Sequence, residues 1–263
     1  MDAEAPGGSP VGSIARAQSV LSALARTPLG ATFTEIMAQT EFTKTTTHRV
    51  LASLMDVHYV YQDPGSRKYH LGSALAALAR IANRSDLAAL AKRSMMRIAE
   101  ASQDTVFLSA PEGAASICVC RELGAFPIRT LTLDAGSRVP LGVGATGQAL
   151  YAVTPKPKRM AAARANEAWM AEYNYTLERA EELAEDFTRR GYALNPSIPV
   201  PGMSAVGLPI VTRGGRLVAA IGTGAINDRM TETRIEKELV PLLRKEAAIL
   251  SDKFSELEKE GLF

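Results

Sequence analysis

The chain has 263 residues and a formal net charge of +2, with 46% hydrophobic and 22% charged residues, which fits two globular domains and excludes a disordered or fibrous protein. No apolar run approaches the roughly 20 residues of a membrane-spanning helix and the first residues lack a secretory signal, so we expect a cytoplasmic protein with no membrane partner. Because the net charge is nearly neutral, any nucleic-acid-binding surface must be a local one.

The first part of the chain predicts three helices. Residues 1–12 are rich in Pro, Gly and small polar residues, which indicates a disordered tail. Apolar residues then recur at helical spacing and predict a first helix. Thr32 or Thr34 can begin a second helix, and Thr43 can cap a third. We expect these helices to belong to one compact domain over residues 13–72.

The segment after the third helix predicts a hairpin. In YVYQDPGSRKYHLG, two short strand-like runs flank a turn at Pro64 and Gly65, and Arg67 and Lys68 lie near its tip. Three helices followed by a basic hairpin are the order of a winged helix-turn-helix domain. In such a domain the third helix enters the major groove of DNA and the hairpin lies along the neighbouring backbone.

The third helix begins with cations and hydroxyl groups, KTTTHR, and continues with apolar residues that can face a core. Threonine hydroxyls, Lys and Arg can bind bases or phosphates. A solvated polar face is the alternative, but threonine is a mediocre helix former, so three in a row favour DNA contact. The candidate DNA-binding residues are Thr34, Lys44, Thr45, Thr46, His48, Arg49, Arg67 and Lys68.

The stretch TFTEIMAQTEFTKTTTHRVLASLMDVHYVYQDPGSRKYHLG resembles the DNA-binding domain of the IclR family of bacterial transcription factors. Two residues depart from the pattern of that family. Glu41 stands where the family usually has a turn glycine, which costs up to about 1 kcal/mol if the backbone needs positive φ. Thr47 replaces a usual buried valine, and its hydroxyl can bond back to a helical carbonyl.

The second half of the chain predicts an α+β fold with an antiparallel sheet over residues 87–263. Strand-like runs occur at TVFLSA, ASICVCREL, PIRTLTL, AVGLPIVT and RLVAAIGTG. Helices are expected over residues 147–153 and 176–190, and a long one from Thr231 to about Glu258. Residues 73–86 look like the linker helix of the family, with an alanine and leucine surface suited to a partner subunit.

The resemblance continues in GSRVPLGVGATGQALYA and in GYALNPSIPVPGMSAVGLPIVTRGGRLVAAIGTGA, which are similar to the GAF-like effector domain of the family. It covers most of residues 13–257 and is weakest over residues 154–169. It implies a repressor or activator whose partners are double-stranded operator DNA and a small-molecule effector, with no cofactor, and which forms dimers or tetramers. The implied effector-binding residues are Ile128, Val139, Ala145, Thr146, Gly147, Asn195, Ala205, Gly222, Thr223 and Gly224.

Four of these positions bear on the ligand. Family members that bind very small keto acids tend to have Asp, Cys, Ser and Ser where this chain has Asn195, Ala205, Gly222 and Gly224. Each replacement is neutral, smaller or less polar, which predicts a wider and more apolar pocket. We therefore expect a partly apolar ligand, such as an aromatic carboxylic acid, and the alternative is a repacked pocket that binds nothing.

Residues suited to catalysis are few. All three histidines lie in the first domain, and GVGATG lacks the lysine of a phosphate-binding loop. Cys118 and Cys120 have no metal-ligand spacing, and we expect them to be reduced and to project to one face of a strand. Two alternatives stay open beside the regulator: a small-molecule-binding enzyme, and a nucleic-acid-binding protein without effector control.

Overall fold

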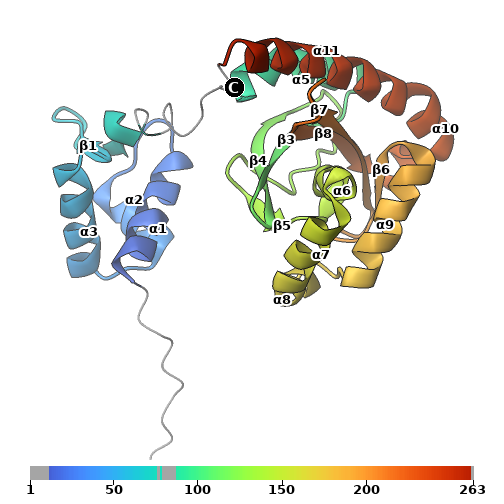
Figure 1. The fold of residues 1–263 in the computed structure, drawn as a ribbon. Coiled ribbons are helices and arrows are strands. Elements are labelled where there is room, and N and C mark those ends of the chain that lie inside the picture. The colour runs from blue at the N-terminus through green and yellow to red at the C-terminus, as the bar shows by residue number, and fades with distance from the viewer. Residues whose placement is uncertain (1–11, 76–77, 79–86, 262–263) are drawn as a thin grey trace, which may run out of the picture. The chain divides into compact units, whose positions relative to one another are not determined.

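The computed structural model describes residues 12–75, 78 and 87–261 (Figure 1). The chain divides into two compact units, Met1–Arg84 and Ser85–Phe263. The predicted tail over residues 1–12 and the predicted linker helix over residues 73–86 lie largely outside the described residues. No helix in the described part of the chain is long and apolar enough to cross a membrane.

Three helices and a hairpin build the N-terminal unit. Its elements are α1 (Ser13–Ala25), α2 (Phe33–Thr40), α3 (Lys44–Asp56), β1 (Val60–Gln62) and β2 (Tyr69–Leu71). The two strands pair antiparallel, and side chains from all three helices and both strands share one core. This arrangement confirms the predicted winged helix-turn-helix order.

Hydroxyl side chains fix where α2 and α3 begin. The hydroxyl of Thr32 accepts a hydrogen bond from the backbone N of Glu35 at 3.3 Å, and the Glu35 carboxylate accepts one from the backbone N of Thr32 at 2.7 Å. The hydroxyl of Thr43 accepts one from the backbone N of Thr46 at 3.3 Å. Such caps satisfy amides that a helix leaves unpaired, so they fix the first residue of each helix.

The two residues that depart from the family pattern adopt the conformations that the sequence suggested. Glu41 ends α2 in the left-handed region, with φ 57° and ψ 22°, so the backbone there does have positive φ. Thr47 is fully buried, and its hydroxyl donates to the carbonyl of Thr43 at 3.0 Å. The polar group that replaces a buried valine is therefore hydrogen-bonded.

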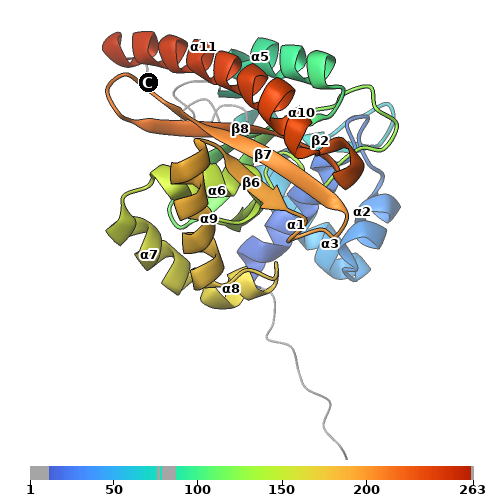
Figure 2. The ribbon, with the colours of Figure 1, turned by 90° about the vertical axis from the view of Figure 1, so that its right-hand side faces the viewer.

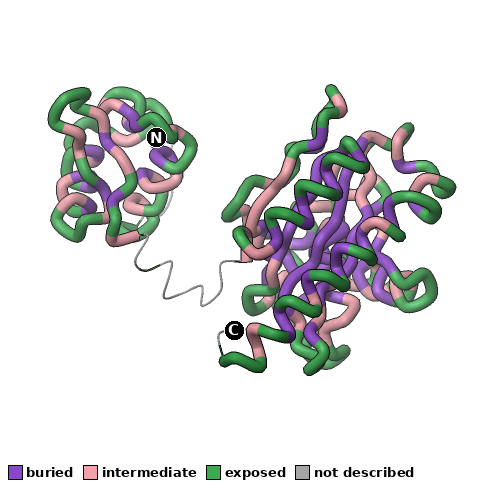
Figure 3. Tube along the Cα trace, turned by 90° about the horizontal axis from the view of Figure 1, so that it is seen from above, coloured by how far each residue is buried: buried purple, intermediate pink, exposed green. Residues whose placement is uncertain are grey.

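A six-stranded antiparallel sheet forms the centre of the C-terminal unit. Its order is β5-β4-β3-β8-β7-β6. The strands are β3 (Thr105–Glu112), β4 (Ala115–Glu122), β5 (Arg138–Pro140), β6 (Ala193–Pro196), β7 (Met203–Val211) and β8 (Leu217–Ile226). Figure 3 shows buried residues concentrated along the strands and the facing sides of the helices.

Helices cover both faces of this sheet (Figure 2). On one face lie α5 (Leu87–Ser102) and α11 (Val240–Lys259), preceded by α10 (Glu232–Arg234) and a π-helical turn, Ile235–Leu239. On the other face lie α6 (Gly144–Val153) and α9 (Leu177–Arg190), with α7 (Lys156–Ala165) and α8 (Glu167–Ala171) beside them. Each face has its own apolar core.

Two expectations about local structure in this unit are wrong. Residues 127–133 form an irregular segment rather than a strand, because the free edge of β4 pairs with Arg138–Pro140 instead. The helix expected from Gly147 begins at Gly144. The helix expected from residue 176 is confirmed, since α9 starts after Thr176, whose hydroxyl accepts from the backbone N of Arg179.

The two cysteines also differ from expectation, because they project to opposite faces of the sheet. A register shift in β3 pairs Leu108 with Cys120 but Ser109 with Cys118. Directly opposite residues share a face, so Cys120 shares the face of Leu108 and Cys118 that of Ser109. Consistent with this, Cys120 Sγ lies 3.3 Å from Met95 Sδ on α5. Neither cysteine forms a disulfide within the described residues.

Candidate functional site

The start of α3 presents a polar, cationic face to solvent. Lys44, Thr45, His48 and Arg49 are exposed, Thr46 is half-buried, and Thr47 faces the core. The ring of His48 lies 6.4 Å, centre to centre, from that of Phe33 at the start of α2. These exposed groups come from one short stretch, so their spacing is set by the helix itself. They form a surface that can donate and accept hydrogen bonds at a groove of DNA.

The hairpin carries two further cations on a rigid turn. The Asp63 carboxylate accepts from the backbone N of Ser66 at 2.6 Å and from its hydroxyl at 2.7 Å, and the hydroxyl bond holds the pKa of Asp63 below its ordinary value. Arg67 follows with φ 61° and is exposed, and Lys68 is half-buried. Thr34 is exposed on α2.

Three exposed cations of this unit are available to a partner. Within the described residues, Lys44, Arg49 and Arg67 take part in no ion pair. An unpaired Lys or Arg on the surface can neutralise a phosphate without first losing a protein contact. The face of α3 and the tip of the hairpin thus suit a polyanion.

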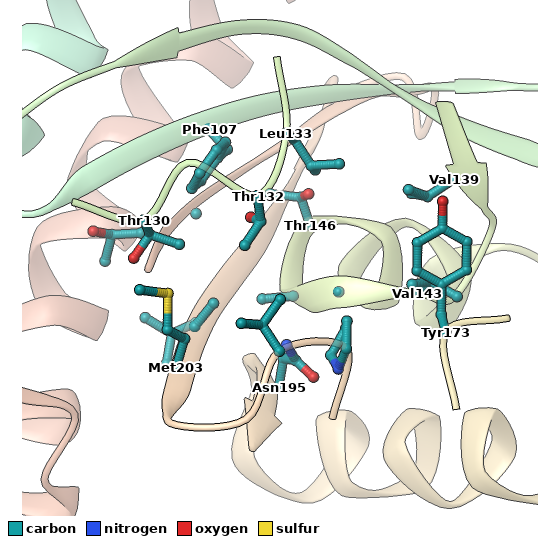
Figure 4. Close-up of a pocket in the computed structure, with 18 residues that line it drawn as sticks. Phe107, Thr130, Thr132, Leu133, Val139, Val143, Thr146, Tyr173, Asn195 and Met203 are labelled. Carbon is teal, nitrogen blue, oxygen red and sulfur yellow. The ribbon is translucent and has the colours of Figure 1, made fainter. Parts of the chain in front are cut away.

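A cavity of about 160 Å³ opens on the α6 side of the sheet in the C-terminal unit (Figure 4). Its walls come from β3, the irregular segment before β5, α6, β6, β7 and β8. The lining residues are Phe107, Thr130, Thr132, Leu133, Val139, Val143, Gly144, Ala145, Thr146, Tyr173, Asn195, Pro199, Val200, Met203, Ala205, Val206, Gly222 and Thr223. None of these described residues is Asp, Glu, Lys, Arg or His, so the walls carry no full charge.

The start of α6 forms one wall. Val143 stands at the N-cap position, where no side chain caps the helix, so a polar group in the cavity could take up amides of the first turn. Gly207 allows β7 to approach this turn closely, because a Cβ there would lie 2.7 Å from the carbonyl oxygen of Ala145. The helix start is thus pressed onto the sheet beside the cavity.

Asn195 is the most constrained polar side chain of the cavity. It lies on β6 and is 7% exposed. The Tyr175 hydroxyl donates to Asn195 Oδ1 at 2.8 Å. Burial raises the pKa of Tyr175 well above its ordinary value, so the hydroxyl keeps its proton. Among the described residues, no hydrogen bond satisfies the amide nitrogen of Asn195.

Two threonines add hydroxyl groups to the walls. Thr146 on α6 shares a hydrogen bond of 2.8 Å with the hydroxyl of Ser109 on β3. Thr130 is 5% exposed, and its hydroxyl has no hydrogen-bond partner in the described part of the chain. Figure 4 shows Thr130 near Phe107 and Met203, apart from Val139 and Tyr173. The cavity is thus apolar with a few hydroxyl and amide groups.

The cavity contains part of the predicted effector-binding set. Seven predicted residues line it: Val139, Ala145, Thr146, Asn195, Ala205, Gly222 and Thr223. Gly147 and Gly224 are not among its lining residues, and Ile128 is 53% exposed on the irregular segment. Ile128 is not among the lining residues, and from the same irregular segment Thr130, Thr132 and Leu133 line the cavity.

Gly222 contributes in a different way from the one expected. A Cβ at this position would lie 2.5 Å from the carbonyl oxygen of Val206 and 3.0 Å from Cγ2 of Thr146. The space above Gly222 is therefore filled by its neighbours, and the glycine permits close packing of α6 rather than widening the cavity.

Metal binding finds no support among the described residues, where no group of three His, Cys, Asp or Glu side chains could hold an ion. The three histidines lie in the N-terminal unit, on α3 and beside or within the hairpin. The polar groups of the cavity are hydroxyls and one amide, which suit binding better than acid–base chemistry.

Comparisons with known proteins agree with both units. The family model described as bacterial transcriptional regulator IclR C-terminal matches residues 79–252, and the IclR helix-turn-helix domain matches residues 13–64. A probable transcriptional regulator, SauR of Cupriavidus necator, is 30% identical over 84% of this chain and 88% of its own length.

Solved structures give the same result. An IclR transcriptional regulator from Alicyclobacillus acidocaldarius is 26% identical, with a TM-score of 0.68 over 92% of this chain and 98% of that one. An IclR homolog from Microbacterium hydrocarbonoxydans, solved with 4-hydroxybenzoate, is 20% identical, with a TM-score of 0.66 over 91% of this chain and 98% of that one. The second likeness concerns the fold alone.

Proposed function

This chain belongs to the IclR family of bacterial transcriptional regulators, and we propose that it controls transcription in response to a partly apolar organic acid bound in the cavity of its C-terminal unit. The resemblance found in the sequence is thereby confirmed, and the family is one of regulators rather than enzymes. Its helix-turn-helix domain implies DNA binding.

For DNA we assign base contacts to the first two turns of α3 and phosphate contacts to the hairpin. Lys44, Thr45, His48 and Arg49 are exposed on α3, and Arg67 on the hairpin. In winged helix-turn-helix docking, the third helix lies in the major groove and the hairpin follows the backbone. Thr34, Thr46 and Lys68 complete the proposed contact set.

The observation that carries the ligand class is an uncharged, largely apolar cavity of about 160 Å³. A closed apolar cavity of about 150 Å³ is large enough for benzene. A single aromatic ring therefore fits this volume, whereas an acid with two or three carbons would leave most of the apolar wall uncovered. Apolar surface removed from water contributes about 25 cal/mol per Å², which favours the larger ligand.

The carboxylate of such a ligand would lie at the start of α6. The first turn of a helix carries a partial positive charge and unpaired amides, which suits an anion where no Lys or Arg is present. Thr146 belongs to this turn and Asn195 also lines the cavity, and both can add hydrogen bonds. A relative of the same fold was solved with 4-hydroxybenzoate, an aromatic acid of this kind.

A thermal-shift comparison on the full chain tests the ligand class. Benzoate and 4-hydroxybenzoate should raise the melting temperature, since a ligand at 100 times its Kd stabilises the folded state by about 2.7 kcal/mol. Glyoxylate and pyruvate should have little effect at equal concentrations. The reverse order would contradict the aromatic acid. If no acid binds, and operator DNA binds without any effector, the chain is better described as a nucleic-acid-binding protein without effector control.

We also propose that the chain self-associates, with residues 73–86 as the linker between a DNA-binding domain over residues 13–72 and an effector domain over residues 87–263. A dimer would present two α3 helices to the two halves of a palindromic site. Light scattering on the full chain should give the mass of a dimer or a tetramer, and a monomer at working concentration would argue against pairing.

A further inference from the structure

Asn195 on β6 is held by a hydrogen bond from a buried tyrosine. The hydroxyl of Tyr175 donates its proton to Asn195 Oδ1 at 2.8 Å. Tyr175 is 1% exposed, so water does not compete for this proton. It lies just before α9, outside the lining of the cavity.

The hydrogen bond from Tyr175 permits only one orientation of the Asn195 side-chain amide. A tyrosine hydroxyl has one proton to donate, and here Asn195 Oδ1 is the acceptor. If the amide were turned over, its NH₂ would donate to the phenolic oxygen, and the buried proton of Tyr175 would lose its acceptor. A buried donor without a partner costs about 1–3 kcal/mol, which is enough to keep the amide nitrogen, rather than the oxygen, toward the cavity.

We infer that Tyr175 is a positioning residue that makes Asn195 a pure hydrogen-bond donor toward the cavity, and that the pocket therefore selects ligands with a carboxylate or carbonyl oxygen at this point. The inference rests on the proposed function and deepens it. Asn195 is only 7% exposed, and its amide nitrogen has no hydrogen-bond partner among the described residues. A bound oxygen would satisfy it.

A purely structural role for Tyr175 would give a different result. In that case the Tyr175 hydroxyl only connects the segment before α9 to β6, and its loss would lower the affinity for every ligand by the same factor. In the proposed role, its loss frees the amide of Asn195 to turn over. Ligands that can only accept a hydrogen bond then bind more weakly, whereas ligands that both donate and accept can bind to either orientation of the amide.

Benzoate and benzamide make this distinction on the full chain, because they share the same ring and nearly the same size. Benzoate only accepts hydrogen bonds, whereas the amide of benzamide donates and accepts. With Tyr175→Phe, the affinity for benzoate measured by calorimetry should fall about tenfold, the effect of one hydrogen bond to a charged group. The affinity for benzamide should change less than about twofold.

Two further variants complete the design. Tyr151→Phe is the matched control: Tyr151 is fully buried on α6, its hydroxyl donates to Glu181 at 2.6 Å, and it does not line the cavity. It should leave the ratio of the two affinities unchanged. Asn195→Asp places an acceptor where the donor was, so benzoate binding should be lost while benzamide binding persists through its NH₂ group.

The outcomes separate the two proposals. If Tyr175→Phe lowers the affinities for benzoate and benzamide equally, or changes neither affinity, the positioning role of Tyr175 is overturned. The proposed aromatic-acid pocket would remain in place. An Asn195→Asp variant that still binds benzoate as wild type does would also overturn the positioning role. If the wild-type protein binds neither ligand, the proposed ligand class fails, and the selectivity inferred from it fails too.

Discussion

The proposed DNA-binding surface and the cavity differ in how far apart in the chain their residues lie. The exposed face of α3 comes from residues 44–49, and its geometry follows from one helix and its cap. The cavity joins Phe107 on β3, Thr146 on α6 and Asn195 on β6, which meet only through tertiary contacts. A local surface should therefore tolerate changes elsewhere in its unit, whereas the cavity should respond to changes in packing.

The largest expected effect tests how strongly the C-terminal unit depends on contacts between distant segments. Asp104 is 1% exposed at its side chain and pairs with Arg229 and Arg234, each at 2.7 Å. Asp104→Ala would remove the only carboxylate that Arg229 pairs with among the described residues and leave Arg234 with the exposed Glu238 alone. It should lower the free energy of unfolding of this unit by about 3–5 kcal/mol. Urea unfolding followed by the fluorescence of Trp169, the single tryptophan, measures this unit.

The control for this variant is Asp252→Ala. Asp252 pairs with Arg213, but the two side chains are 56% and 65% exposed. Removing an exposed pair should cost no more than about 1 kcal/mol. If both variants lower the free energy of unfolding equally, burial of the ion pairs of Asp104 does not determine how much they stabilise the unit.

The second prediction concerns the start of α6. A Cβ at Gly207 would lie 2.7 Å from the carbonyl oxygen of Ala145 and 3.2 Å from the backbone N of Thr146. Gly207→Ala should therefore shift the helix start and lower the free energy of unfolding by about 1–3 kcal/mol. Affinity for the aromatic acid should fall with it, because the first turn of α6 is a wall of the cavity.

Gly224→Ala is the matched comparison on the neighbouring strand. Its Cβ would meet Thr130, Ala205 and Phe107 at 3.4–3.7 Å, which is ordinary contact. It should change stability and benzoate affinity less than Gly207→Ala does, when both are measured by chemical unfolding and calorimetry. A greater loss of binding with Gly224→Ala would instead place Gly224 in contact with the ligand, as the family resemblance implied.

The same contrast explains which features the sequence could predict. The caps at Thr32 and Thr43 involve partners three residues away, so the local pattern contains them in full. Residues 127–133 contain Ile and Thr, residue types that are common in strands, but whether they pair depends on which segment takes the edge of β4. Tyr175 gave no signal because only the fold brings its hydroxyl to Asn195.

The third prediction tests whether the α3 surface reads DNA. Arg49→Ala should weaken operator binding by about 1–3 kcal/mol if Arg49 makes a bidentate contact with a base. If Arg49 meets only phosphate, binding should weaken on all sequences and the salt dependence should fall by about one contact. Fluorescence anisotropy at several salt concentrations separates the two cases.

Arg26→Ala provides the control, because Arg26 is an exposed arginine at the end of α1, away from α3 in the sequence. It removes the same charge from the same unit and should leave operator affinity nearly unchanged. If Arg49→Ala has no larger effect than Arg26→Ala, the exposed face of α3 is not the DNA-reading surface.

The smallest expected effect is a gain in stability from one local change. Glu41 ends α2 with φ 57°, a conformation that favours glycine, and its carboxylate lies at the negative end of the helix. Glu41→Gly should stabilise the N-terminal unit by up to about 1 kcal/mol, measured as slower amide hydrogen exchange in α2 and α3 of the full chain.

Glu41→Gln removes the charge but keeps the side chain, so it should recover only part of the gain. If Gln stabilises as much as Gly, charge rather than backbone conformation is the cause. In either case Trp169 unfolding should not change, because the caps of α2 and α3 lie within their own unit.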